Sequence, residues 1–168
     1  MKTLTKPILI GTAITIGLLG PIASSQAAEI GPYIGIGAAQ SDDELLNETE
    51  SAFKAFVGAN ITHNIGFELS YVDLGTFASG ALSQEGIAYE VIGYLPLSHE
   101  LDLYGRAGFF DWEVSDNSGA VVGTEPTFGI GANIRLNPHA SLRGEWQTFL
   151  DVDGGDVDLY SASLSFNF

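Results

Sequence analysis

Apolar and polar residues alternate with a period of two along most of the chain after residue 30. Such alternation is typical of strands whose two faces meet different environments. In one segment, Phe67, Leu69 and Tyr71 share a face, while Glu68 and Ser70 share the opposite one. Segments of about ten residues with this pattern indicate transmembrane strands. We predict eight of them, at 31–40, 52–62, 65–75, 84–96, 100–112, 124–137, 140–149 and 157–168.

The connections between these segments are predicted to alternate in length. Three are interpreted as tight turns, at 62–64, 96–99 and 137–139. Four are interpreted as longer polar loops, at 41–51, 76–83, 113–123 and 150–156. After residue 27 no run of 18 apolar residues offers a transmembrane helix. The pattern therefore predicts an all-β fold, an eight-stranded antiparallel up-and-down transmembrane β-barrel, with short periplasmic turns, longer extracellular loops and both termini periplasmic.

The first 27 residues have the features of a secretory signal peptide. Lys2 and Lys6 precede an apolar run at 8–22, and Ser25 and Ala27 supply the small residues of a cleavage site. The alternative is a retained membrane anchor, but this run is shorter than the roughly 20 residues that a spanning helix needs. We expect residues 1–27 to be a signal peptide and residues 28–168 to form an outer-membrane β-barrel domain.

Charge separates a membrane barrel from the soluble alternatives. Beyond residue 27 only four cations, Lys54, Arg106, Arg135 and Arg143, accompany all twenty-one acidic residues. An acidic surface repels nucleic acid, and the absence of Cys excludes disulfides. Each cation falls on the polar face of a predicted strand, as expected if the other face meets hydrocarbon, where a Lys or Arg costs about 2–4 kcal/mol. The alternative is a soluble sandwich or lipocalin-like barrel, in which these cations are solvated.

An eight-stranded barrel has an interior that holds side chains and little else. The polar faces of the strands are predicted to place six charged residues there as water-bridged ion pairs: Lys54, Glu68, Glu90, Arg106, Arg143 and Glu145. Two interpretations remain open. The charges form a structural network, or they line a narrow, low-conductance ion pathway.

Aromatic residues are expected at the two edges of the apolar belt and in the last strand. The girdle candidates are Tyr33, Tyr71, Trp146, Phe149, Tyr160, Phe166 and Phe168. The final segment resembles the targeting strand that the outer-membrane barrel-assembly machinery recognises, since an unpaired amphipathic strand is a template for pairing. The residues that carry this assembly signal are Tyr160, Leu164, Phe166 and Phe168. The alternative is an ordinary last strand.

The acidic residues gather in two clusters within the predicted loops. One comprises Asp42, Asp43, Glu44, Glu48 and Glu50. The other, comprising Asp151, Asp153, Asp156 and Asp158, has a spacing that resembles a loop for Ca²⁺, which takes six to eight oxygen ligands. The alternative for both is a solvated loop, and no cofactor is indicated.

Catalysis is not favoured by the histidines. His63, His99 and His139 all fall in predicted turns and lack the spacing of metal ligands. Ser98, His99 and Glu100 are adjacent, but neighbours along a turn rarely point at one another in the way a nucleophile and base require. We expect no enzyme activity.

Patches that cover most of the chain after residue 30 are similar to the OmpA-like family of outer-membrane barrels. They lie at 33–37, 56–71, 94–97, 103–108, 126–131, 137–138 and 142–147, with Trp112. The resemblance covers the barrel only, since nothing here corresponds to the family's periplasmic peptidoglycan-binding domain, and in size the chain is closer to the OmpX type. It implies a structural surface protein in contact with membrane lipid and lipopolysaccharide. The alternatives are a small porin and an OmpX-type adhesion or resistance protein.

The resemblance also bears on the interior charges. Glu68, Arg106, Arg143 and Glu145 match inward charged positions that can form a gate in the family. Ile92 and Asn133 depart from the family pattern, which would have a Lys and a Glu at these places.

Overall fold

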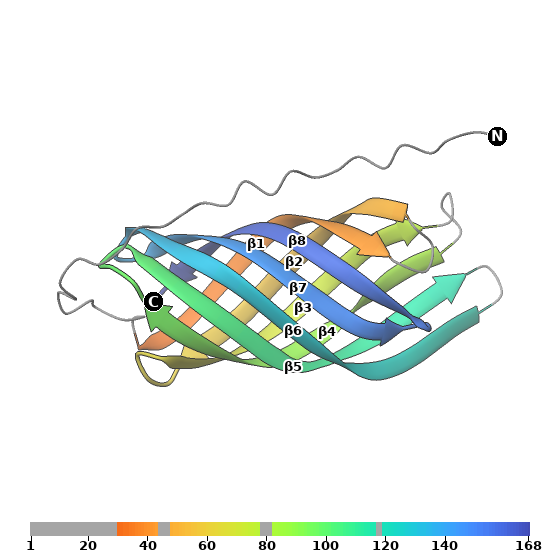
Figure 1. The fold of residues 1–168 in the computed structure, drawn as a ribbon, viewed down its shortest axis with the longest axis horizontal. Coiled ribbons are helices and arrows are strands. Elements are labelled where there is room, and N and C mark those ends of the chain that lie inside the picture. Colours follow the sequence, from red (N-terminus) through yellow and green to blue (C-terminus); the bar gives the residue numbers. More distant parts are fainter. Residues whose placement is uncertain (1–29, 44–47, 78–81, 117–118) are drawn as a thin grey trace, which may run out of the picture.

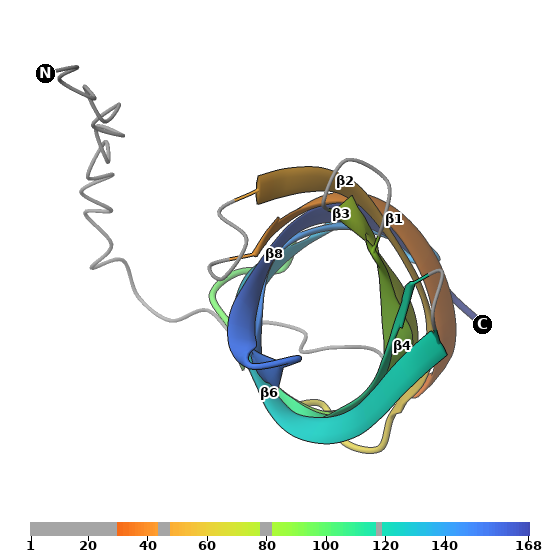
Figure 2. The ribbon, with the colours of Figure 1, turned by 90° about the vertical axis from the view of Figure 1, so that its right-hand side faces the viewer.

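A computed structural model of the chain describes residues 30–43, 48–77, 82–116 and 119–168 (Figure 1). Within these ranges the chain forms eight strands: β1 (Gly31–Asp43), β2 (Glu48–Asn60), β3 (Ile65–Phe77), β4 (Leu82–Pro96), β5 (Leu101–Asp116), β6 (Gly119–Asn137), β7 (Ala140–Val152) and β8 (Gly155–Asn167). Each strand pairs antiparallel with its neighbours in sequence, and β1 pairs with β8, so the sheet closes on itself (Figure 2). The predicted fold class is confirmed. The described ranges hold no helix long and apolar enough to cross a membrane.

The barrel has two distinct ends. The turns 61–64, 97–100 and 138–139 lie at the same end as Phe168, which we call the terminal end. Two of these turns use the same device, because Thr62 Oγ1 accepts the N–H of Ile65 at 3.0 Å and Ser98 Oγ accepts that of Leu101 at 3.1 Å. The opposite end, where β1–β2, β3–β4, β5–β6 and β7–β8 connect, is the far end.

The predicted alternation of long and short connections is wrong. The strands continue through most of 41–51, 76–83, 113–123 and 150–156, because an amphipathic hairpin can extend beyond the segment that alternation marks. Between β7 and β8, Val152 pairs with Gly155, so only Asp153 and Gly154 make the turn. Their φ values of +51° and +87° suit a two-residue Asp-Gly hairpin turn.

Along most of the barrel the outward side chains are apolar. Leu69, Ile130 and Leu164 are 48%, 63% and 43% exposed, and similar residues surround them on every strand. The side chains that alternate with them point inward and are mostly polar or small. We call this part the central zone. An apolar belt of this extent on the outside is far larger than the patches of a soluble monomer.

Towards the far end the two faces of the strands exchange character. On β5, Asp111 and Glu113 are exposed, while Phe110, Trp112 and Val114 are buried inside. The same reversal occurs on β3, where Val72 and Leu74 turn inward, and on β8, where Val157 and Leu159 do so. We call this part the far zone. It has the polarity of a soluble barrel, although its strands continue those of the central zone.

Glycines on the inner wall make room for large side chains on neighbouring strands. Gly123 pairs directly with Trp112, and Gly129 pairs directly with Arg106. A Cβ at Gly123 would lie 2.5 Å from Trp112 Cζ2, and one at Gly129 would lie 3.0 Å from Arg106 Cγ. These pairs allow a narrow barrel to enclose bulky groups.

Candidate functional site

Arg106 is the centre of an ion-pair network in the barrel interior. Its Nη1 donates to Glu145 Oε2 at 2.6 Å, its Nη2 to Glu68 Oε1 at 2.8 Å, and its Nε to Glu90 Oε1 at 2.8 Å. Nη2 also pairs with Glu90 Oε2. The guanidinium extends from β5 and meets carboxylates from β3, β4 and β7. One fully buried side chain therefore links four strands across the interior.

Two further cations complete the network. Arg143 Nη1 pairs with Glu68 Oε2 at 2.7 Å, and Lys54 Nζ pairs with Glu145 Oε1 at 2.6 Å. Lys54 also donates to Gln147 Oε1 at 2.8 Å. The guanidinium of Arg143 lies 4.9–5.3 Å from the ring centroids of three aromatic residues, which are Tyr33, Phe56 and Tyr104.

The charges of this network balance. The structure brings together all six predicted interior residues, three cations with three carboxylates, and each side chain is at most 4% exposed. A buried charge is tolerable when it is paired and hydrogen-bonded. The arrangement therefore cross-links the strands and leaves no net charge in the middle of the barrel.

The interior at the terminal end is polar and small. Arg135 Nη2 pairs with both carboxylate oxygens of Asp102, at 2.8 and 2.9 Å. Tyr94, Asn133 and Arg143 are among the residues that line a cavity of about 20 Å³ there, which is roughly the space of one water molecule.

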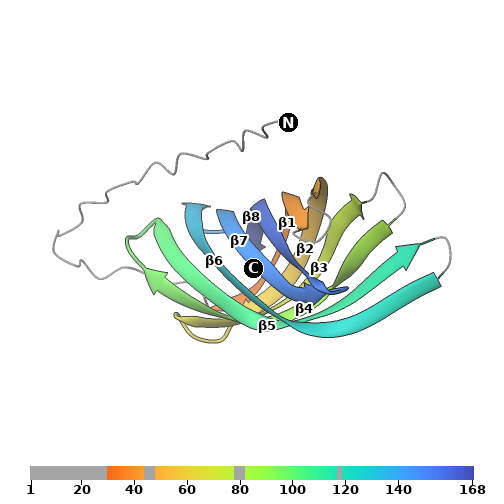
Figure 3. The same ribbon diagram turned by 45° about the vertical axis from the view of Figure 1, so that its right-hand side comes forward.

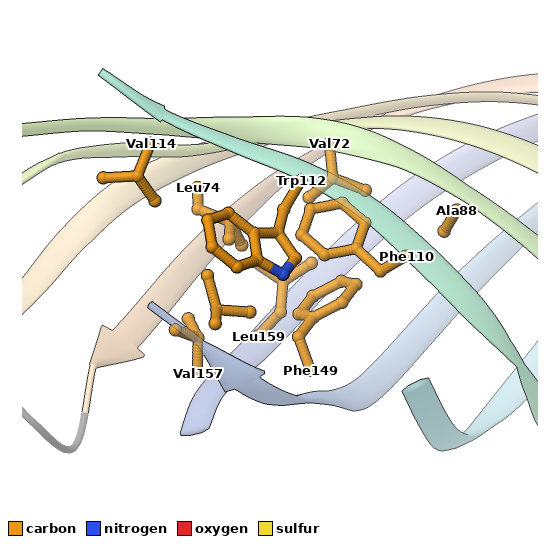
Figure 4. Packing of buried hydrophobic residues seen from close by; sticks show 10 residues of the cluster. Val72, Leu74, Ala88, Phe110, Trp112, Val114, Phe149, Val157 and Leu159 are labelled. Carbon is orange, nitrogen blue, oxygen red and sulfur yellow. The ribbon is translucent and has the colours of Figure 1, made fainter. Parts of the chain in front are cut away.

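Apolar side chains form a cluster in the interior at the far end (Figure 4). The rings of Phe110 and Phe149 contact each other at a tilt of 45°, with their centroids 4.3 Å apart, and Trp112 lies beside them. We call this cluster the apolar plug; its members are Val72, Leu74, Ala88, Phe110, Trp112, Val114, Phe149, Val152, Val157 and Leu159. The expectation of a polar interior is wrong for β3, β5 and β8 in this zone, whose inward positions become apolar. On β1 and β4 the inward positions stay polar, since Gln84 Nε2 donates to the buried Asp43 there.

Two of the predicted girdle aromatics face inward. Tyr33 is 3% exposed and donates its hydroxyl to Glu68 Oε2 at 3.0 Å, and Phe149 is fully buried in the apolar plug. The strand pleat explains why Phe149 faces inward. On β7 it is on the same face as Gln147, which is buried, and on the other face from Trp146. The candidates with exposed side chains are Tyr71, Tyr160, Phe166 and Phe168.

The residues of the predicted assembly signal lie on the outward face of the closing strand or directly after it. Tyr160, Leu164 and Phe166 are on β8, and Phe168 follows it. All four side chains are exposed, from 43% to 75%. In the folded barrel β8 pairs with both β1 and β7, so both of its edges are occupied.

The candidate calcium residues surround the β7–β8 hairpin. Asp156 Oδ1 accepts the backbone N–H of Asp151 at 2.9 Å, and Asp153 occupies the turn. No three acidic or histidine side chains in the described ranges come together in a way that could hold a metal ion. In the other acidic cluster, Glu44 lies outside the described residues, as does the predicted signal peptide.

In the structure, the side chain of Ser98 stabilises the turn in which it lies. Its Oγ accepts backbone N–H groups from Glu100 and Leu101, at 3.3 and 3.1 Å. His63, His99 and His139 lie in three separate turns of the terminal end, and all three are exposed.

A closed barrel with an apolar outside and a charged inside is the architecture of an integral membrane β-barrel, because closure satisfies the backbone groups that hydrocarbon cannot. The chain belongs to the outer membrane protein beta-barrel domain family, whose profile matches residues 12–168. It is an outer-membrane protein of the OmpA-like type.

Known proteins similar to this chain share its architecture. Outer membrane protein A of Salmonella typhi is 26% identical over 150 residues, which cover 76% of this chain and 43% of that protein. The chain thus spans less than half the length of the curated relatives it matches. The N-terminal barrel domain of Pseudomonas aeruginosa OprF superimposes with a TM-score of 0.65 at 14% identity, over 83% of this chain and 100% of that one. Ail, the attachment invasion locus protein of Yersinia pestis, superimposes with a TM-score of 0.59 at 16% identity, over 84% of this chain and 100% of that one.

Proposed function

We propose that this chain is a structural surface protein of the outer membrane whose barrel is closed to ions. The observation that carries the proposal is the filling of the interior along its length. A balanced ion-pair network occupies the middle, and the apolar plug occupies the far end. A conducting pore needs a continuous hydrated path, and a barrel of this strand number has little space to spare.

The exchange of polarity along the strands supports an orientation. The apolar belt of the central zone faces lipid, and the far zone, with acids outside and an apolar core, stands in water. We place the far end outside the cell and both termini in the periplasm, as the resemblance to OmpA-like barrels implies. Residues 1–27 then act as a cleaved signal peptide, and the exposed face of β8 serves the assembly machinery before β1 and β8 pair.

The acidic surface of the far zone is the part that meets partners in this proposal. Asp111 and Glu113 point outward just beyond the apolar belt, at the level expected for lipid headgroups and lipopolysaccharide. No catalytic role is proposed, and a lipid A hydrolysis assay with the pure protein should give no product.

The alternative function is that of a small porin. It would require the network around Arg106 to separate and the apolar plug to rearrange. The paired charges leave no excess of either sign to attract one class of ion. We therefore place this alternative second.

Two measurements test the proposal on the refolded chain. A compact, faster-migrating band before boiling is expected on a gel, as for a closed barrel in detergent. Planar-bilayer recording of the same material should give a flat current trace, whereas discrete steps would reject the closed barrel in favour of the porin. The same recording on the double variant Phe110→Ala, Trp112→Ala tests whether the ion-pair network around Arg106 is enough to block ions. We expect the current trace to stay flat.

A further inference from the structure

The hydrogen-bonded pairing of β6 is one-sided near the far end. β6 pairs with β5 along most of its length, from Gly119 with Asp116 to Ile134 with Leu101. Its pairing with β7 begins only at Thr127, opposite Phe149. Residues 120–126 therefore have β5 on one side and, within the described ranges, no strand on the other. Figures 1 and 3 show the β5–β6 hairpin projecting beyond the β7–β8 hairpin.

This free edge has the composition of a pairing surface. In an antiparallel strand, alternate residues direct their N–H and C=O groups away from the neighbouring strand. The segment Ala120-Val121-Val122-Gly123-Thr124 carries no charge and no proline. Val121 and Val122 are 55% and 70% exposed. Proteins usually protect such an edge with Lys, Pro or a bulge, and here the protecting residues Glu125 and Pro126 stand only at its base.

The edge is held in an extended conformation by the hairpin that bears it. Trp112 packs over Gly123, and Val114 opposite Val121 is buried in the apolar plug. Thr124 Oγ1 donates to Asp111 Oδ1 at 2.5 Å across the pair. A partner strand would therefore find its template already ordered, which lowers the entropic cost of binding.

The charges around the edge define its partner. Asp111 and Glu113 are exposed on β5, and Asp151, Asp153 and Asp156 are exposed around the β7–β8 hairpin that follows β6 in the barrel. The four cations of the described ranges are paired with acids inside the barrel. A second copy of this chain would bring the same acids to the interface, and like charges repel.

We propose that Ala120–Thr124 binds, by strand addition, an extended polypeptide segment in which basic and β-branched residues alternate. The backbone of the segment pairs with the free edge of β6, and its Lys or Arg side chains meet the surrounding carboxylates. This surface is independent of whether the barrel conducts, so the two proposals fail separately.

The test uses the full refolded chain and a synthetic peptide of alternating Lys and Val residues. Amide hydrogen exchange followed by NMR should show protection of residues 120–124 when the peptide is added, by about tenfold or more. A peptide of the same sequence with alternate backbone amides N-methylated keeps the charge but loses one pairing edge, and it should not protect them. For a peptide with Glu in place of Lys, the affinity should be lower by about tenfold or more.

Two variants of equal charge locate the site. Val122→Lys places a cation on the edge, so the affinity for the basic peptide should fall about tenfold. Thr49→Lys adds the same charge at an exposed position on β2, and the affinity should stay within about twofold. Binding of the basic peptide without protection of 120–124 would overturn the proposal, as would no binding. Self-association that protects these amides would assign the edge to a second copy instead.

Discussion

The central zone and the far zone use one continuous set of strands but opposite arrangements of polarity. In the central zone Leu69 faces out and Glu68 faces in, whereas a few residues along the same strand Asp73 lies on the outer face and Leu74 faces in. The pleat itself does not change, because side chains alternate at every residue. In the orientation that we propose, what changes is the surroundings, which are lipid for one zone and water for the other. If so, the point of exchange marks the membrane boundary within the sequence.

The two zones also hold the barrel together by different interactions. The network around Arg106 depends on complete pairing, since loss of one partner leaves the remaining charges unpaired in an interior of low dielectric constant. The apolar plug depends on volume, since its side chains have no directional partners. The central zone should thus respond most to changes of charge, and the far zone to changes of size.

The largest effect is expected from Arg106→Met, which leaves three buried glutamates short of their shared partner. Loss of one member of a buried ion pair costs about 3–5 kcal/mol. The urea midpoint of the refolded barrel should fall accordingly, and the fraction that folds on a gel should drop. Arg135→Met is the comparison, because in the described part of the chain Arg135 pairs with one carboxylate, that of Asp102, instead of three, and its side chain is 18% exposed. It should cost less than Arg106→Met.

A second change sharpens the charge argument for Arg106. Adding Glu90→Gln to Arg106→Met removes one of the stranded carboxylates, so part of the lost stability should return. An Arg106→Met barrel with the wild-type midpoint would show that the network is not needed for folding.

The membrane boundary is tested by placing a lysine on each side of it. Leu69→Lys puts a cation on the outer face of the central zone, which should cost about 2–4 kcal/mol in lipid vesicles. Glu113→Lys puts one on the outer face of the far zone, where a surface change stays within about 0.5 kcal/mol. Unfolding in vesicles measures both. Equal penalties would mean that the exchange of polarity does not mark the boundary.

Alternation in the sequence predicted the central zone well, because lipid outside and charge inside give neighbouring residues opposite character. It predicted the number of strands and the inward position of residues such as Arg106 and Glu145. It failed for the far zone, where residues 113–123 were interpreted as a loop although most of them belong to β5 and β6, with Glu113 on the exposed outer face of β5. Tyr33 and Phe149 were misplaced for a related reason, since an inward aromatic ring breaks the rule that apolar means outward.

The partners of the interior residues could not be predicted from spacing. Arg106 lies 38 residues from Glu68 and 39 from Glu145, and only barrel closure and register bring them together. The Asp153-Gly154 turn, in contrast, was visible in the sequence. Asp-Gly between two amphipathic segments is a strong hairpin signal, but the surrounding acids drew the interpretation towards a cation loop.

The sensitivity of the far zone to volume is tested by Gly123→Ala. The new methyl group would collide with the Trp112 ring, and overpacking of this kind costs about 1–3 kcal/mol. Gly144→Ala is the control, because nothing lies within 4 Å of a Cβ there. Tryptophan emission in a Trp146→Phe background would report whether Trp112 moves. Identical stability of the two alanine variants would contradict the tight packing of the apolar plug.

The smallest effect is expected at the β7–β8 turn, where two interpretations of one acidic stretch can be separated. Gly154 has a φ of +87°, so Gly154→Ala should cost about 1 kcal/mol through the left-handed conformation alone. Asp153→Asn removes a carboxylate but keeps a side chain that tolerates positive φ, so stability should not change. If the stretch acts only as a turn, millimolar Ca²⁺ should leave the urea midpoints of the wild type and of Asp153→Asn equal. A calcium-dependent rise in the wild type that Asp153→Asn abolishes would show that these aspartates hold a cation after all, and that the turn geometry is compatible with one.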